Sequence, residues 1–416
     1  MRTATNNPFT PGSDIVPQVW AGRITQLNDW EAVVRPRRCV GLPERGRTIL
    51  GEAGLGKSTL VRRIATMAEQ QGDWVTPQLR IPMGADPFKA VGSAILTLAD
   101  KAGLPTSRER RIKDMLDRVR TVAASGISVT LDRGTGPEPY TSLTDLLIEV
   151  GLAAIEREVA VLIHIDEVQN ISSEETLSQL LVCLGDAIAH ETSVTAPGGV
   201  EIKRVLPLAV YLTGLTEFAD MAGAKKGATF ARRFATTRLG PIDDSDLRMA
   251  LQPFVTPGWT VTNDQGGTSQ VRMNPDAVDA IIRLCCGEPF LFQLAGERAW
   301  YAGTGPVITA DEVFEGWSAA RHEAAAHVER ILARLPGRER QLLEAMADMP
   351  PQDRTATKIA QAMGFTNAPQ AGPTAQRLDT VRGIIDRGRL YTFRHRAVEA
   401  YLTSGWPNLD PSESTQ

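Results

Sequence analysis

The chain has few cysteines, no long apolar run and no apolar signal core among its first residues. Its four cysteines, Cys39, Cys183, Cys285 and Cys286, lack the spacing of metal ligands, so we expect reduced, buried thiols. A membrane span would need a run of about 18 apolar residues, and a secretion signal would need an apolar core near the start of the chain. Because both are missing, the sequence predicts neither. Together these absences predict a cytoplasmic protein.

The chain also lacks a strong excess of charge of either sign. Lysine and arginine number 45 against 49 aspartates and glutamates, which gives a formal net charge of -4. This balance excludes a global attraction to nucleic acid or to an anionic membrane, so any basic surface must be local. The length of 416 residues and the hydrophobic share of 42% predict a globular protein of several domains.

One short stretch, GEAGLGKST, matches the phosphate-binding pattern G-x-x-x-x-G-K-[ST] in full. It follows an apolar segment that ends in RTIL and opens an amphipathic stretch, which is the strand–loop–helix context that the pattern requires. The glycines let backbone N–H groups surround phosphate, Lys57 meets the β and γ oxygens, and Ser58 ligates Mg²⁺. The predicted cradle comprises Gly51, Glu52, Ala53, Gly54, Leu55, Gly56, Lys57, Ser58 and Thr59.

A pair of carboxylates ends the aliphatic stretch VAVLIHIDE. We predict that Asp166 holds Mg²⁺ through water and that Glu167 polarises the attacking water. The pair favours an ATPase over a small-molecule kinase, and the alternative is a charged strand end that faces solvent.

Two later elements are candidates for contact with the γ-phosphate. Thr213 ends the aliphatic stretch RVLPLAVYLTG, where its hydroxyl can reach the γ-phosphate or be purely structural. The stretch FARRF offers Arg232 and Arg233 as an arginine finger for the nucleotide of a neighbouring subunit, which would imply self-assembly. The alternative is that these are solvated surface arginines.

Aliphatic segments alternate with amphipathic helical patterns over the first part of the chain. The alternation predicts an α/β fold with a parallel sheet, whose central strands must be apolar on both faces. Residues 126–138 predict a strand pair or an inserted loop. After Pro241 the patterns become mainly helical, interrupted at GWTVTNDQGGTSQVRM by a predicted hairpin.

The C-terminal part predicts three helices followed by a strand-like wing, which is the order of a winged-helix domain. From Ala371 to Arg396 there are six arginines against two aspartates. We therefore consider contact with duplex DNA, and the alternatives are a protein-docking module or a solvated face. The candidate DNA-binding residues are Arg377, Arg382, Arg387 and Arg389.

With these residues placed, the chain resembles the AAA+ and STAND-like P-loop ATPases, the group that includes the archaeal-type ATPase domain and the initiator-like AAA+ proteins. AGRITQL resembles their "GR" box, which implies that Gly22 and Arg23 lie near the adenine. GEPFLFQLAGERAW resembles the G-x-P motif of the STAND lid, which implies that Gly287 and Pro289 pack near the base and ribose. There is no clear sensor arginine, and this departure favours a slow, switch-like ATPase.

The resemblance and the patterns together predict a P-loop NTPase sheet with a helical lid and a C-terminal winged helix. The predicted boundaries are 1–45 for a lead-in with the GR box, 46–240 for the ATPase core, 241–305 for the lid, 306–336 for a linker helix, 337–404 for the winged-helix-like domain, and 405–416 for a disordered tail.

Three functions remain open at this stage. The leading hypothesis is an ATPase switch that uses ATP and Mg²⁺ and whose nucleotide state controls assembly or movement of the lid. The second is a DNA-binding ATPase of the initiator or transposition type. The third is a nucleotide-gated scaffold that recruits a protein partner and hydrolyses little ATP.

Overall fold

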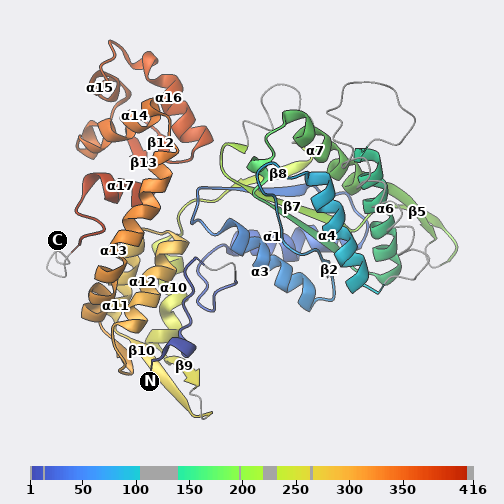
Figure 1. Ribbon diagram of the computed structural model, residues 1–416, viewed down its shortest axis with the longest axis horizontal. Helices are drawn as coiled ribbons and strands as arrows, with labels where there is room; N and C mark the ends of the chain where they lie inside the picture. Colours follow the sequence, from blue (N-terminus) through green and yellow to red (C-terminus); the bar gives the residue numbers. More distant parts are fainter. Residues whose placement is uncertain are drawn as a thin grey trace. The chain divides into compact units, whose positions relative to one another are not determined.

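The structure, a computed structural model, divides into two compact units (Figure 1). The sheet unit comprises Ile24–Leu50 and Leu60–Arg238, and the helical unit comprises Met1–Arg23, Gly51–Thr59 and Leu239–Gln416. The residues described are 2–12, 15–103, 139–195, 198–218, 232–262 and 266–409. The strand pair or loop predicted for residues 126–138 lies outside this part of the chain.

A parallel sheet forms the centre of the sheet unit, in the order β2-β4-β7-β1-β8, with β3 also paired to β4. This confirms the predicted α/β fold class. Every residue of β4 and β7 is buried, because helices cover a central parallel strand on both faces. The strands are β1 (Gly46–Leu50), β2 (Trp74–Val75), β3 (Leu79–Arg80), β4 (Val161–Asp166), β7 (Leu208–Gly214) and β8 (Phe234–Arg238).

The register brings the carboxyl ends of three strands to one edge of this sheet. Leu50 of β1 is level with Gly214 of β7, and Ile165 of β4 is level with Leu212 of β7. In open parallel sheets the residues that follow these ends are the ones available for ligand binding. The P-loop follows β1, and Asp166 is the last residue of β4.

Among the described residues, six α-helices contribute to the sheet unit, and apolar residues of α4, α6 and α7 share one core with β4 and β7. These helices are α1 (Ile24–Asp29), α2 (Arg35–Cys39), α3 (Lys57–Gln70), α4 (Pro87–Lys101), α6 (Pro139–Arg157) and α7 (Glu174–Ala189). The first three residues of α3 belong to the helical unit.

The stretch RVLPLAVYLTG forms two strands, where the sequence predicts one. β6 (Glu201–Val205) pairs antiparallel with β5 (Glu191–Thr195), whereas β7 begins only at Leu208 in the parallel sheet. Pro207 lies at the break, where its missing N–H prevents a continuous ladder.

The helical unit contains the predicted lid and the long helix that follows it, and α11, α12 and α13 run beside one another (Figure 1). The predicted hairpin is confirmed, since β9 and β10 pair antiparallel. The elements are α10 (Asp244–Val255), β9 (Trp259–Thr262), β10 (Thr268–Met273), α11 (Pro275–Cys285), α12 (Pro289–Tyr301), β11 (Val307–Ile308) and α13 (Ala310–Ala333).

The C-terminal part has three helical segments followed by a two-stranded hairpin and a last helix, in the order that the sequence predicts for a winged helix. The elements are α14 (Gly337–Ala347), α15 (Ala356–Ala362), α16 (Gly372–Gln376), β12 (Ile385–Arg387), β13 (Tyr391–Phe393) and α17 (Arg396–Thr403). No helix among the described residues is long and apolar enough to cross a membrane.

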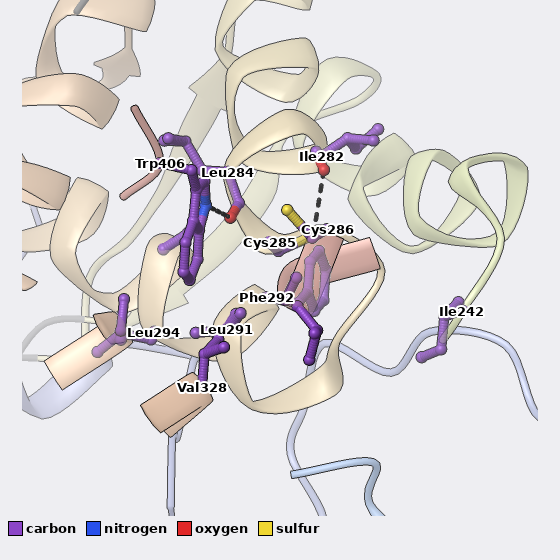
Figure 2. Packing of buried hydrophobic residues seen from close by; sticks show 14 of the residues in the cluster. Ile242, Ile282, Leu284, Cys285, Cys286, Leu291, Phe292, Leu294, Val328 and Trp406 are labelled. Carbon is purple, nitrogen blue, oxygen red and sulfur yellow. Dashed lines mark hydrogen bonds between the residues drawn. The ribbon is translucent and has the colours of Figure 1, made fainter. Parts of the chain in front are cut away.

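Residues 405–409 differ from the predicted disordered tail. Trp406 is 3% exposed, and its indole Nε1 donates a hydrogen bond of 2.9 Å to the carbonyl oxygen of Leu284 (Figure 2). The thiol of Cys285 lies in the same apolar cluster and donates to the carbonyl of Ile282. A buried aromatic ring therefore holds this segment against α11, and the sequence prediction overlooked it among prolines and polar residues.

Candidate nucleotide site

The predicted phosphate cradle is a tight loop between β1 and α3. Gly54 and Gly56 have φ angles of +87° and +76°, a left-handed conformation that favours glycine. At Gly51 a Cβ atom would lie 3.2 Å from the carbonyl oxygen of Leu239. The glycines of the pattern therefore satisfy backbone constraints, and α3 begins at Lys57 so that its first N–H groups point back toward the loop.

Within the helical unit, residues of α12 and α13 contact this loop. The carbonyl oxygen of Gly54 accepts a hydrogen bond of 3.2 Å from the backbone N–H of Phe290, and a Cβ atom at Gly54 would lie 2.4 Å from Cε1 of His327. Pro289, which the resemblance places near the base and ribose, lies 3.6 Å from the position of a Cβ atom at Gly56.

The two charged residues of the loop have defined partners. Lys57 is 8% exposed, and its Nζ donates a hydrogen bond of 3.0 Å to the carbonyl oxygen of Glu52. The carboxylate of Glu52, 3% exposed, forms an ion pair with Arg334 just beyond α13. The loop therefore carries its cation inside, where phosphate oxygens would be bound.

The predicted GR box contacts the loop through its arginine. Nη2 of Arg23 donates to the carbonyl oxygens of Leu55, at 3.1 Å, and of Gly240, at 2.7 Å. Burial lowers the pKa of Arg23 to about 10, against the opposing effect of nearby aspartates, so the guanidinium stays charged at neutral pH. At Gly22 a Cβ atom would lie 2.9 Å from a carboxylate oxygen of Asp246. Contact of these residues with adenine stays a prediction.

Asp166 lies at the carboxyl end of β4 in the sheet unit and is fully buried. Its Oδ1 accepts hydrogen bonds from the Thr213 hydroxyl and, at 3.0 Å, from the backbone N–H of Glu167. Its Oδ2 accepts one of 2.8 Å from Nε2 of Gln78. The alternative of a solvent-facing strand end therefore does not apply to Asp166.

Glu167 is half-buried, and its backbone is left-handed, with φ of +58°. The side-chain amide of Gln169 donates to its carboxylate, while Oε1 of Gln169 accepts from the backbone N–H of Leu215, just after β7. A non-glycine residue in this conformation stores backbone strain that the surrounding contacts must hold, a feature common at functional sites.

Thr213 is fully buried at the end of β7. Besides Asp166, its hydroxyl contacts Nε2 of His164, at 3.1 Å. Burial lowers the pKa of His164 to about 4, and the nearby Asp166 opposes this shift. Sequence patterns do not identify Gln78, and the one signal for His164 is that it is a polar residue inside the aliphatic stretch VLIHID.

The two arginines proposed as a finger have different surroundings. Arg233 forms an ion pair with Asp186 of α7 in its own chain, and its side chain packs over Gly185. Arg232 is exposed. Of the two, Arg232 is therefore the better candidate for contact with another subunit.

Most of the C-terminal arginines that the sequence singles out form internal ion pairs. Arg377 and Arg382 both donate to Glu339 of α14, at 2.9 and 3.0 Å. Arg387 donates to Asp379 at 3.0 Å. Arg389, on the turn between β12 and β13, is exposed.

No family model matches the sequence, and no curated protein matches it either. Solved structures do match. The chain is similar to the Aeropyrum pernix ORC2 protein in ADPNP–ADP complexes, with a TM-score of 0.53 and 15% identity over 92% of this chain and 93% of that one. It is also similar to the Walker-type ATPase PABY2304 of Pyrococcus abyssi, with a TM-score of 0.52 and 13% identity over 92% of this chain and 96% of that one.

Similarity over almost the whole length, at this low identity, concerns the fold. The sheet order β2-β4-β7-β1-β8, with a P-loop after β1 and a carboxylate pair at the end of β4, agrees with it. The chain therefore has the fold of the AAA+ P-loop ATPases, with a C-terminal winged-helix-like region similar to that of an archaeal ORC protein.

Proposed function

We propose that the chain is a Mg²⁺-dependent ATP-binding and ATP-hydrolysing switch. Two observations support this most: a complete phosphate loop directly follows β1 in the chain, and, in the sheet unit, a buried aspartate ends β4 with a left-handed glutamate directly after it. A small-molecule kinase would not need the second carboxylate, whose place beside the aspartate is that of a residue that polarises water.

Each residue has a defined role in this proposal. The ammonium of Lys57 exchanges its hydrogen bond with the Glu52 carbonyl for phosphate oxygens and balances the charge of the departing ADP. The Ser58 hydroxyl and the Asp166 carboxylate are oxygen donors of the type that Mg²⁺ prefers. Glu167 orients a water molecule for attack on the γ-phosphorus and accepts its proton as the bond to ADP breaks.

The substitution Glu167→Gln tests the enzymatic part of this proposal. It removes the proton acceptor while keeping size and hydrogen-bonding shape, so turnover should fall at least about a hundredfold and ATP affinity should stay within about threefold. The control is Glu174→Gln, an exposed residue at the start of α7, which should leave both unchanged. Undiminished hydrolysis by Glu167→Gln would refute the assignment.

We keep nucleotide-gated DNA binding as a second candidate, because Arg389 is exposed on the turn of a wing-like hairpin. Affinity for DNA falls as salt concentration rises, and each arginine that neutralises a phosphate makes the slope of log affinity against log salt concentration steeper by about 0.9. If Arg389 and at most one other basic residue contact phosphates, the magnitude of this slope should be about 1 to 2. It should decrease by about one in Arg389→Ala. Affinity that does not respond to salt would eliminate this candidate.

The third candidate is a nucleotide-gated scaffold, and the exposed Arg232 keeps self-assembly open. Sedimentation in the presence of ATP or of ADP measures assembly and distinguishes the scaffold from the ATP-hydrolysing switch. ATP-dependent assembly that persists in Glu167→Gln, with very slow wild-type turnover that DNA does not change, would favour the scaffold.

A further inference from the structure

The polar groups around Asp166 form a chain of hydrogen bonds inside the sheet unit, buried from His164 to Asp166 and half-buried from Gln78 to Arg62. It runs from His164 through Thr213 to Asp166, and from Asp166 through Gln78 to Arg62. Its members come from β4, the end of β7, the segment before β3, and α3. Such a chain fixes a carboxylate more firmly than a single bond, because each group orients the next.

The hydrogen count of Thr213 decides what its hydroxyl can do. A hydroxyl has one hydrogen, and the hydroxyl of Thr213 donates it to Oδ1 of Asp166. The 3.1 Å contact with His164 must then be one in which Nε2–H of the imidazole donates to the hydroxyl oxygen. In this arrangement Thr213 has no hydrogen left to donate to a phosphate oxygen.

The orientation of the Gln78 amide follows from the same reasoning. The guanidinium of Arg62 can only donate, and its Nε and Nη2 lie 3.2 and 2.6 Å from Oε1 of Gln78. The amide nitrogen must therefore face Asp166, to whose Oδ2 it donates at 2.8 Å. Because Arg62 lies on the helix that begins at Lys57, Gln78 links that helix to the carboxylate.

We propose that Gln78 and Thr213 are positioning residues, which hold the carboxylate of Asp166 in one orientation for Mg²⁺ binding, and that Thr213 acts through Asp166 and not on the γ-phosphate. The inference rests on the proposed function, since it concerns the same metal and nucleotide. It replaces the direct role of Thr213 expected from its place at a strand end. It also assigns a role to Gln78, for which the sequence gives no motif.

Two volume-conserving substitutions test it, Thr213→Val and Gln78→Leu, each of which removes one hydrogen bond to the carboxylate. Binding of a fluorescent ADP analogue and of ATP is measured in the full chain across a Mg²⁺ titration and with a chelator. We expect the half-saturating Mg²⁺ concentration to rise about tenfold in each variant, as loss of a hydrogen bond to a charged group implies. Nucleotide affinity without metal should stay within about twofold.

Two matched variants guard against effects on folding. Thr213→Ser keeps the hydroxyl and should restore most of the Mg²⁺ affinity. Thr48→Val removes a buried threonine hydroxyl from β1 of the same sheet and should leave the Mg²⁺ dependence unchanged. If Thr213→Val does not fold, Gln78→Leu and Thr213→Ser still decide the question.

Three outcomes overturn the inference. One is a loss of ATP affinity but not of ADP affinity in Thr213→Val with the Mg²⁺ dependence unchanged, which would place the hydroxyl on the γ-phosphate. Another is an unchanged Mg²⁺ dependence in both variants. The third, a wild-type chain that binds nucleotide without any response to Mg²⁺, would refute the proposed function as well, and this separates the two failures.

Discussion

Removal of the buried carboxylate of Glu339 should destabilise the C-terminal region strongly. Glu339 is 2% exposed on α14 and receives hydrogen bonds from Nε of Arg377 and Nε of Arg382. Arg382 is itself 6% exposed, so Glu339→Leu leaves a guanidinium in the protein interior without this counter-charge. Arg377 is half-exposed and can turn to water.

The magnitude follows from these two exposures. Breaking a buried ion pair by removing one partner costs about 3–5 kcal/mol, whereas loss of a solvent-exposed pair costs about 0–1 kcal/mol. We therefore expect about 3 kcal/mol, nearly all of it from Arg382. The double variant Glu339→Leu with Arg382→Met should recover most of this loss, because it removes the buried guanidinium together with the carboxylate.

Hydrogen exchange of the full chain measures the effect where it occurs. A loss of about 3 kcal/mol makes protected amides of α14 exchange about a hundredfold faster, when their exchange proceeds through opening of this region. The matched control is Glu344→Gln on the same helix, which removes an exposed i,i+4 pair with Arg340 and should cost under about 0.5 kcal/mol. Equal exchange rates in Glu339→Leu and Glu344→Gln would refute the reasoning.

Two further predictions concern buried side chains. Burial raises the pKa of the Cys183 and Cys285 thiols to about 12 and also raises the pKa of Cys286, so at pH 8 a thiol reagent should react quickly with Cys39 at most, and with all four thiols only after unfolding. Fast reaction of two or more thiols in the native chain would contradict the packing. Trp406→Ala should cost about 3–5 kcal/mol in urea denaturation, and a neutral result would restore the predicted disordered tail.

The parts of the fold that the sequence predicts are those determined locally. The glycine pattern, the apolar strand before it and the amphipathic helix after it lie within one short stretch, and each follows from neighbouring residues. The same is true of β4, whose continuous aliphatic residues identify a buried parallel strand ending at Asp166. Predicting each of these elements requires no knowledge of how far apart they lie in the folded protein.

The supporting contacts of the candidate site could not be predicted in this way. Gln78 precedes Asp166 by 88 residues, and Thr213 reaches it only because β7 is the neighbour of β4 in the sheet. No periodicity in a single sequence gives strand order, and strand order decides which polar side chains meet. The same limit explains why the sequence does not predict a role for His164, which lies in a strand whose other residues before Asp166 are all aliphatic.

The net charge of a sequence window proved to be a poor measure of basic surface for the same reason. Two residues outside the arginine-rich C-terminal segment, Glu339 and Asp244, form ion pairs with three of its arginines, Arg377, Arg382 and Arg396. A carboxylate that packs against an arginine neutralises the charge of that arginine at short range. If the arginine of a buried pair bound a phosphate instead, its carboxylate partner would remain buried without that counter-charge. DNA binding by this segment would therefore have to work with the arginines that remain exposed, or to open pairs at a cost that binding would have to exceed.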